Sequence, residues 1–198
     1  MSGSNTLYVV GGGQDQRRLA SLYGALLMRV IDDALIIASS RPERRLDPPL
    51  LCALDEVANI AAIPALGRYA SAGLGPGVLL LSVLQDYSQA LEHWGQERAQ
   101  SILANHTAKL FASGIGDPAT LRYIAELLGH ERVQQRSEHK GNASKSTTTG
   151  EHLEPLAPPW RIRQAAADSA LLVYGRVPPA WVALRPYFKN RQLRKLAA

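Results

Sequence analysis

The chain has 198 residues, a formal net charge of +5 and a sequence pI near 9.6, with 46% hydrophobic and 20% charged residues. This length allows one domain with a sizeable core, and the composition is that of an ordinary globular protein. The sequence contains no apolar run of the roughly 18 residues that a membrane helix needs, no signal-peptide pattern, and only one cysteine, which excludes an internal disulfide. These features favour a cytosolic protein, and the positive charge suits an anionic partner such as nucleic acid.

The first half of the chain alternates between short apolar runs and helical patterns. Residues 6–10 are a short β-like run that ends in three glycines, and apolar residues over 19–30 recur at helical spacing. After a proline-rich break, "LLCALDEV" and "VLLLSVLQ" are continuous apolar strands of the kind buried in parallel sheets. Helices are expected over 64–72 and 88–94.

The second half continues this alternation. "QERAQSILANHT" predicts a helix, "AKLFAS" a strand, and "DPATLRYIAELLG" a helix with Asp117 at its N-cap and Gly129 just past its end. Alternating strands and helices predict an α/β fold, with a parallel sheet and helices on both of its faces.

The remaining sequence divides the chain further. Residues 130–159 are polar and contain no aromatic residue, which predicts a flexible loop. Beyond it, "ALLVYGRV", "PP" and "AWVALRPY" predict a terminal β-hairpin, two strands joined by a tight turn. The expected segments are therefore 1–129, 130–159 and 160–198.

Polar side chains close the two apolar strands. Asp55 and Glu56 end one strand, Gln85 ends the next, and ligands of parallel sheets bind beyond the carboxyl ends of the strands. An apolar strand followed by Asp-Glu is the pattern of a Walker B motif, in which the Asp orients Mg²⁺ through water and the Glu polarises the attacking water. Gln85 is a neutral donor and acceptor of the kind that senses a γ-phosphate. On the dipeptide alone, two acids that face solvent or cap a turn are the alternative.

The order of the segments "LDEVANIAAIPALGRYASAG", "VLLLSVLQDYSQALEHWG" and "SILANHTAKLFASGIGDPATLRYIAELLG" resembles the TraG/TraD family of type IV coupling proteins. These are hexameric ATPases that bring DNA and relaxase to a conjugation channel. The resemblance runs from about residue 6 to 129, with a weaker match over 160–188. It implies the C-terminal portion of a RecA-like P-loop NTPase, with Asp55 and Glu56 as the Walker B pair and Gln85 facing the γ-phosphate.

The resemblance also implies cofactors and partners. The intact parent would use ATP and Mg²⁺, with Asp55 holding the metal through water, and would assemble as a homo-hexamer. Relaxosome proteins, a relaxase and DNA would be its partners. The parent's membrane anchor would hold this portion, which has no membrane segment of its own, at the cytoplasmic face of the plasma membrane.

Two parts of such a motor are missing from the sequence. The phosphate-binding pattern G-x-x-x-x-G-K-[ST] occurs nowhere in it, and "GGGQDQRR" is interpreted as a strand-ending turn. Tight nucleotide binding by this chain alone is therefore not expected. An arginine finger of some family members precedes the Gln-bearing strand, but Arg68 lies several residues too early. Asp86 stands where the family usually has Ser, and it is left outside the site because a carboxylate repels phosphates.

The C-terminal stretch "RPYFKNRQLRKLAA" is basic and contains no acid. One interpretation is a solvated helix whose cations suit the negative end of the helix dipole. The other is a tail that contacts DNA phosphates through four cations, namely Lys189, Arg191, Arg194 and Lys195.

Three hypotheses on function follow. The leading one is a fragment of a conjugative coupling ATPase that recruits the relaxosome and drives DNA transfer, and that is inactive alone. The second is a binding module without a P-loop, which docks relaxosome or DNA-processing proteins and hydrolyses nothing. The third is a fragment of a DNA translocase that does not serve conjugation.

Overall fold

The structure is a computed structural model that describes residues 5–61, 63–140 and 145–196. The chain divides into two compact units, Met1–Thr107 and Ala108–Ala198. This boundary lies earlier than the one expected after Gly129, because the strand that opens the second unit pairs with a strand far along the chain. In the described part of the chain, no helix is both long and apolar enough to span a bilayer.

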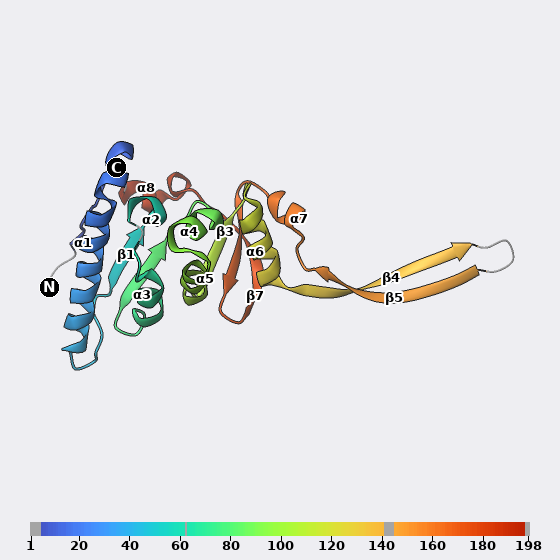
Figure 1. The fold of residues 1–198 in the computed structure, drawn as a ribbon, viewed down its shortest axis with the longest axis horizontal. Coiled ribbons are helices and arrows are strands. Elements are labelled where there is room, and N and C mark those ends of the chain that lie inside the picture. Colours follow the sequence, from blue (N-terminus) through green and yellow to red (C-terminus); the bar gives the residue numbers. More distant parts are fainter. Residues whose placement is uncertain (1–4, 62, 141–144, 197–198) are drawn as a thin grey trace. The chain divides into compact units, whose positions relative to one another are not determined.

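The first unit combines a parallel strand pair with helices (Figure 1). Its strands pair in register from Leu50 opposite Val78 to Leu54 opposite Ser82. The elements in chain order are α1 (Gly13–Ser39), β1 (Leu50–Leu54), α2 (Val57–Ile60), α3 (Leu66–Ala72), β2 (Val78–Ser82), α4 (Tyr87–Trp94) and α5 (Gln96–Asn105).

One face of the strand pair is buried and the other is open. Cys52, Leu54 and Val78 belong to the core cluster, together with buried residues of the helices such as Ile31, Tyr69 and Ile102. On the opposite face Leu51 is 62% exposed and Leu81 is 56% exposed. The parallel sheet expected with helices on both faces is thus present here as two parallel strands that are covered on one face.

Two element predictions differ from the structure in this unit. Residues 6–10 form no strand, because nothing pairs with them among the described residues, and Leu7, Tyr8 and Val10 are largely exposed. The strand predicted over 78–85 ends at Ser82, so Gln85 lies in the connection that leads to α4. The other helices and strands expected in this half are confirmed, with α1 longer at both ends.

The second unit is built on an antiparallel sheet in the order β3-β6-β7. Its core includes Leu121 and Ile124 of α6 and Leu171 of β6. The predicted caps of α6 are confirmed, since the Asp117 carboxylate accepts a hydrogen bond from the Thr120 N–H at 2.8 Å and Gly129 follows the last turn. The elements in chain order are β3 (Ala108–Ala112), α6 (Pro118–Leu128), β4 (His130–Lys140), β5 (Lys145–Pro155), α7 (Pro159–Arg163), β6 (Ser169–Tyr174), β7 (Val177–Ala183), the 3₁₀ helix η1 (Tyr187–Lys189) and α8 (Arg191–Leu196).

The predicted terminal hairpin is confirmed, but its turn lies elsewhere. β6 and β7 pair with Tyr174 opposite Val177, so the turn consists of Gly175 and Arg176, and Gly175 has a positive φ of 52°. Two-residue hairpin turns need such conformations. Pro178 and Pro179 lie inside β7, which is an edge strand and therefore tolerates the loss of backbone donors.

Residues 130–159 contain a β-ribbon where a loop was expected. β4 and β5 pair antiparallel from His130 opposite Pro155 to Lys140 opposite Lys145 (Figure 1). The loop prediction was wrong about secondary structure because it rested only on the lack of apolar residues that could form a core. An antiparallel ribbon pairs its backbone groups across the strands and can leave its faces in water. The mobility of this segment stays a prediction.

Candidate functional site

The parallel pair brings the predicted polar residues to one edge. β1 ends at Leu54, and the ladder continues past both strands: the Val83 N–H donates to the Leu54 carbonyl at 2.9 Å, and the Val57 N–H donates to the Val83 carbonyl at 3.2 Å. Asp55 and Glu56 lie between these two bonds on one side, and Gln85 follows Val83 on the other. The expectation that they would share the carboxyl edge of the sheet therefore agrees with the backbone geometry.

A sharp turn at Glu56 leads the chain from β1 into α2. Glu56 has φ 46° and ψ 42°, a left-handed conformation, and it occupies the N-cap of α2. A non-glycine residue in this region costs of order 1 kcal/mol or more, and such strain tends to collect at functional sites. The Asp55 carboxylate accepts a hydrogen bond from the Glu56 N–H at 3.1 Å. Both acids are exposed, so each carboxylate can reach a ligand beyond the sheet edge.

Side-chain hydrogen bonds join Glu56 to the backbone of Gln85. The Asn59 amide donates to the Glu56 carboxylate at 3.4 Å, and the Gln89 amide donates to the Asn59 oxygen at 2.8 Å. The Gln89 oxygen then accepts a hydrogen bond from the Gln85 N–H at 3.3 Å. Sequence reasoning named the two ends and missed Asn59 and Gln89. The signals were the spacing of three residues from Glu56 to Asn59 and the Ser-Gln pair that follows the Gln85 strand.

Asp86 has a structural role at the start of α4. Its backbone is extended, with φ −157°, and its carboxylate accepts a hydrogen bond from the Gln89 N–H at 2.7 Å. An N-cap aspartate satisfies one of the free donors at a helix start and is stabilised by the helix dipole. The carboxylate is therefore engaged with α4, which gives a physical reason for leaving Asp86 outside the site.

An open pocket of about 610 Å³ lies beside this hydrogen-bond chain and includes Gln85 but neither Asp55 nor Glu56. The glycine run over residues 11–13 leads directly into α1, because Gly12 is the N-cap of that helix, and the described residues ahead of the run, 5–10, form no strand. The pocket wall is rich in carboxamides and consists of Gly13, Gln16, Asn59, Gln85, Asp86, Ser88, Gln89, Glu92 and His93.

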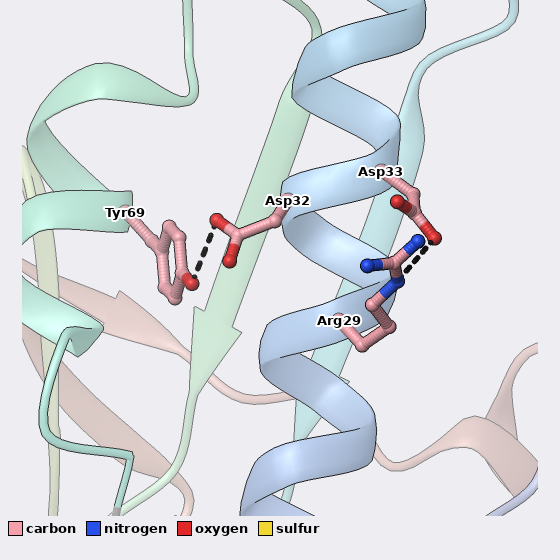
Figure 2. A network of polar contacts seen from close by, with 4 residues as sticks. All are labelled: Arg29, Asp32, Asp33 and Tyr69. Carbon is pink, nitrogen blue, oxygen red and sulfur yellow. Dashed lines mark hydrogen bonds and ion pairs between the residues drawn. The ribbon is translucent and has the colours of Figure 1, made fainter.

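Arg68 is engaged between α1 and α3. The buried Tyr69 hydroxyl donates to the Asp32 carboxylate at 2.9 Å, and the Arg68 guanidinium lies 3.6 Å from the same oxygen and 4.6 Å from the centre of the Tyr69 ring. Figure 2 shows Asp32 on α1 turned toward Tyr69, whereas the exposed Arg29–Asp33 pair lies on another side of the helix. Burial, the hydrogen bond to Asp32 and the charge of Asp32 raise the pKa of Tyr69.

The described residues contain no group of three or more side chains placed to hold a metal ion. A Mg²⁺ that keeps most of its waters and binds substrate phosphates needs only one or two protein carboxylates. An exposed Asp55 fits that limited requirement.

The basic C-terminal residues are solvent-exposed. The tail forms α8, a helix as in the first of the two interpretations, and α8 has no acid in its first turn. Such exposure agrees with a solvated helix and equally with a surface that contacts phosphates. The exposed cations are Lys189 in η1 and Arg191, Arg194 and Lys195 in α8.

A comparison with protein families identifies the chain. Residues 49–166 match the family described as the TraM recognition site of TraD and TraG. The chain belongs to this family. The resemblance seen in the sequence is thereby confirmed, and the matched segment contains the Asp55–Glu56 pair, Gln85 and both linking amides. No curated protein sequence matches the chain significantly.

Solved structures of a bacterial conjugative coupling protein, TrwB, share the fold. The unbound monoclinic form of TrwBdeltaN70 is 22% identical, with a TM-score of 0.65, and the match covers 89% of this chain and 41% of that chain. TrwB in complex with the non-hydrolysable ATP analogue ADPNP is 20% identical (TM-score 0.62), and TrwB in complex with ADP and Mg²⁺ is 21% identical (TM-score 0.60). Each of these two matches covers 85% of this chain and 38% of the other. At these identities the likeness shows the fold alone, and the chain spans about two fifths of the length of these proteins.

Proposed function

We propose that the chain provides the C-terminal part of the motor of a conjugative coupling ATPase. Family membership and the TrwB-like fold support this function. The observation that supports it most directly is the sheet edge, where Asp55 and Glu56 follow the end of β1 and Gln85 lies in the connection that follows β2. The strand pair would be one part of a larger RecA-like parallel sheet, and the apolar face with Leu51 and Leu81 would be covered by the rest of that motor.

The three residues would divide the chemistry of phosphoryl transfer. Asp55 would hold Mg²⁺ through water, Glu56 would polarise the attacking water, and Gln85 would face the γ-phosphate. Mg²⁺, when bound, neutralises charge on the phosphates. This sequence has no G-x-x-x-x-G-K-[ST] motif, so residues outside it would have to cradle the phosphates. We therefore expect the purified chain to hydrolyse ATP no faster than buffer. Robust turnover that disappears in Glu56→Gln would overturn that expectation.

Assembly and partners are part of the same proposal. The motor would be a homo-hexamer at the cytoplasmic face of the plasma membrane, and it would meet a relaxase, DNA and a relaxosome protein of the TraM type. The description of the family as a TraM recognition site supports the last of these partners.

The deciding experiment uses a coupling protein in which this sequence is joined to a P-loop. Glu56→Gln removes the water-activating carboxylate, so hydrolysis should be abolished while nucleotide binding survives. Glu97→Gln is the matched control, because Glu97 is an exposed acid in the first turn of α5 and does not line the pocket beside the hydrogen-bond chain. Turnover near the wild-type rate in Glu56→Gln would show that Glu56 does not activate the attacking water.

A binding module without hydrolysis is the second candidate, and the missing P-loop motif favours it. Both candidates predict that the purified chain binds a relaxosome protein. The two candidates make different predictions for cells in which the Glu56→Gln variant is the only copy of this protein. The motor proposal predicts loss of DNA transfer, and the module proposal predicts transfer at the wild-type frequency.

A further inference from the structure

We propose that Asn59 and Gln89 are positioning residues that couple Glu56 to Gln85. The coupling runs through the hydrogen bonds that connect the Glu56 carboxylate to the Gln85 N–H. A change in what the carboxylate binds therefore changes the hydrogen bond that the Gln85 N–H makes. This inference rests on the proposed function for its consequence, since Glu56 and Gln85 are the residues assigned there to water and phosphate. The hydrogen-bond chain itself is a property of the folded first unit.

The direction of this chain is fixed at both ends. A carboxylate can only accept hydrogen bonds, and a backbone N–H can only donate. Asn59 must therefore turn its NH₂ toward Glu56 and its oxygen toward Gln89. Gln89 must turn its NH₂ toward Asn59 and its oxygen toward Gln85. The orientation of a side-chain amide is often ambiguous, but here only one arrangement satisfies all three contacts.

The chain also spans separate elements of the first unit. Glu56 is the N-cap of α2 and Asn59 lies within α2, the helix that follows β1. Gln85 precedes α4 and Gln89 lies within α4, the helix that follows β2. Asn59 and Gln89 are half-buried, and their mutual hydrogen bond is the shortest of the three at 2.8 Å. A second bond anchors Gln89, because its backbone N–H donates to Asp86. The contact at Glu56 is the longest at 3.4 Å, which leaves that carboxylate able to exchange Asn59 for a ligand.

The first test follows the Gln85 amide by NMR in the purified chain without nucleotide. Glu56→Gln replaces a charged acceptor with a neutral one, so the hydrogen bond from Asn59 weakens and less polarisation is passed along the chain, and the Gln85 N–H resonance should shift. In a Gln89→Met background the link is absent and the side chain keeps its length, so the same Glu56→Gln change should no longer shift that resonance. Gln100→Met, at an exposed glutamine of α5, is the matched control and should leave the response unchanged.

The second test exchanges the charge between the two ends. In Gln89→Glu the new carboxylate faces the Asn59 oxygen, and because both groups can only accept, the link between positions 59 and 89 is broken. In the double variant Glu56→Gln with Gln89→Glu, the new amide at position 56 donates to the Asn59 oxygen, and the Asn59 NH₂ donates to the new carboxylate at position 89. That carboxylate still accepts from the Gln85 N–H, so every link is satisfied again. The Asn59 NH₂ donates to a carboxylate as it does in the wild type, so the double variant should return the Asn59 side-chain resonances toward their wild-type positions. Asp86 repels the new carboxylate in both variants, so this repulsion cancels in the comparison.

These measurements separate the inference from the proposed function. The coupling is overturned if Glu56→Gln shifts the Gln85 N–H resonance equally in the wild-type and Gln89→Met backgrounds. It is also overturned if the double variant restores none of the resonances that Gln89→Glu displaces. The Trp94 indole N–H, which donates to the Ile63 carbonyl, reports whether each variant is folded, and Asn59→Leu provides a second break in the chain. No nucleotide takes part, so failure of the hydrolysis experiment would leave these results standing. In a P-loop-bearing motor, Gln89→Met should lower kcat by about tenfold or more with nucleotide affinity unchanged, and an unchanged kcat would overturn the positioning role.

Discussion

Tyr69→Phe removes one hydroxyl from the contact between α1 and α3 and leaves the ring in place. The hydroxyl donates to the Asp32 carboxylate at 2.9 Å, and Tyr69 is only 1% exposed (Figure 2). The variant therefore tests how much this polar contact contributes to the stability of the first unit.

The expected loss follows from the surroundings of Asp32. Hydrogen bonds to charged groups contribute about 1.5–3 kcal/mol to stability. The Asp32 side chain is 47% exposed, and Arg68 lies 3.6 Å away, so water and the guanidinium offset part of the loss. We expect a decrease in the free energy of unfolding of about 1 kcal/mol. Arg29→Ala is the control, because the exposed Arg29–Asp33 pair should contribute only about 0.3–0.5 kcal/mol.

Urea unfolding monitored at the Trp94 indole resonance measures this loss in the first unit alone. Such a local probe is needed because two compact units can unfold separately. A Tyr69→Phe effect no larger than that of Arg29→Ala would refute the assignment of a stabilising role to the Tyr69 hydroxyl.

The same contact predicts a pH dependence. Burial, followed by the hydrogen bond to Asp32 and its negative charge, raises the pKa of Tyr69 above the usual value of 10.0. The folded protein then keeps the phenol protonated at a pH at which the unfolded chain loses its proton. The contribution of this group to stability is fully present below about pH 10 and decreases as the pH rises through the raised pKa. The difference between wild type and Tyr69→Phe should therefore narrow above about pH 10, and a widening difference would contradict the direction of the shift.

Three further predictions concern other parts of the chain. Trp94→Phe should lower stability by about 1–3 kcal/mol, because the buried indole N–H donates to the Ile63 carbonyl at 3.0 Å. An effect below that of Arg29→Ala, with urea unfolding of both variants monitored at the Gln85 amide resonance of the same unit, would contradict this. Limited proteolysis should cut first within 130–159, since a two-stranded ribbon is marginally stable, and initial cleavage within 50–85 would argue against the assigned core. The last of the three replaces four cations of the tail with Ala, namely Lys189, Arg191, Arg194 and Lys195. If the tail contacts DNA, each lost cation should reduce the slope of log affinity against log salt by about 0.7–0.9. An unchanged slope, both in this chain and in an assembled motor, would show that the tail does not contact the DNA.

Local sequence signals were sufficient for most elements. Asp117, Pro118 and Gly129 mark both ends of α6, and the continuous apolar runs located β1 and β2. Residues 6–10 have the composition of a strand but form none, because a strand also needs a neighbour to pair with. The ribbon of β4 and β5 was missed for the opposite reason, since its polar residues pair without a core.

The candidate site shows the same limit at the level of single residues. The sequence was enough to group Asp55, Glu56 and Gln85, because parallel strands place their carboxyl ends at one edge of the sheet. This holds for any sequence in the segment that connects the two strands. Asn59 and Gln89 are thirty residues apart, and only the packing of α2 against α4 makes them partners.

Asp86 shows how a departure from a family pattern can leave a site intact. From the sequence, a carboxylate next to Gln85 argues against phosphate binding, because like charges repel. In the structure the same carboxylate accepts the Gln89 N–H at the first turn of α4, where the partial positive charge of the helix stabilises it. That bond also holds Gln89 in the position from which its side chain reaches both Asn59 and Gln85. Asp86 thus supports the hydrogen-bond chain, and Asp86→Ala should loosen Gln89 whereas Asp86→Asn, which keeps the capping oxygen, should not. A Gln85 amide resonance that is equally displaced in both variants would show that the charge of Asp86, and not its capping bond, is what acts on this edge.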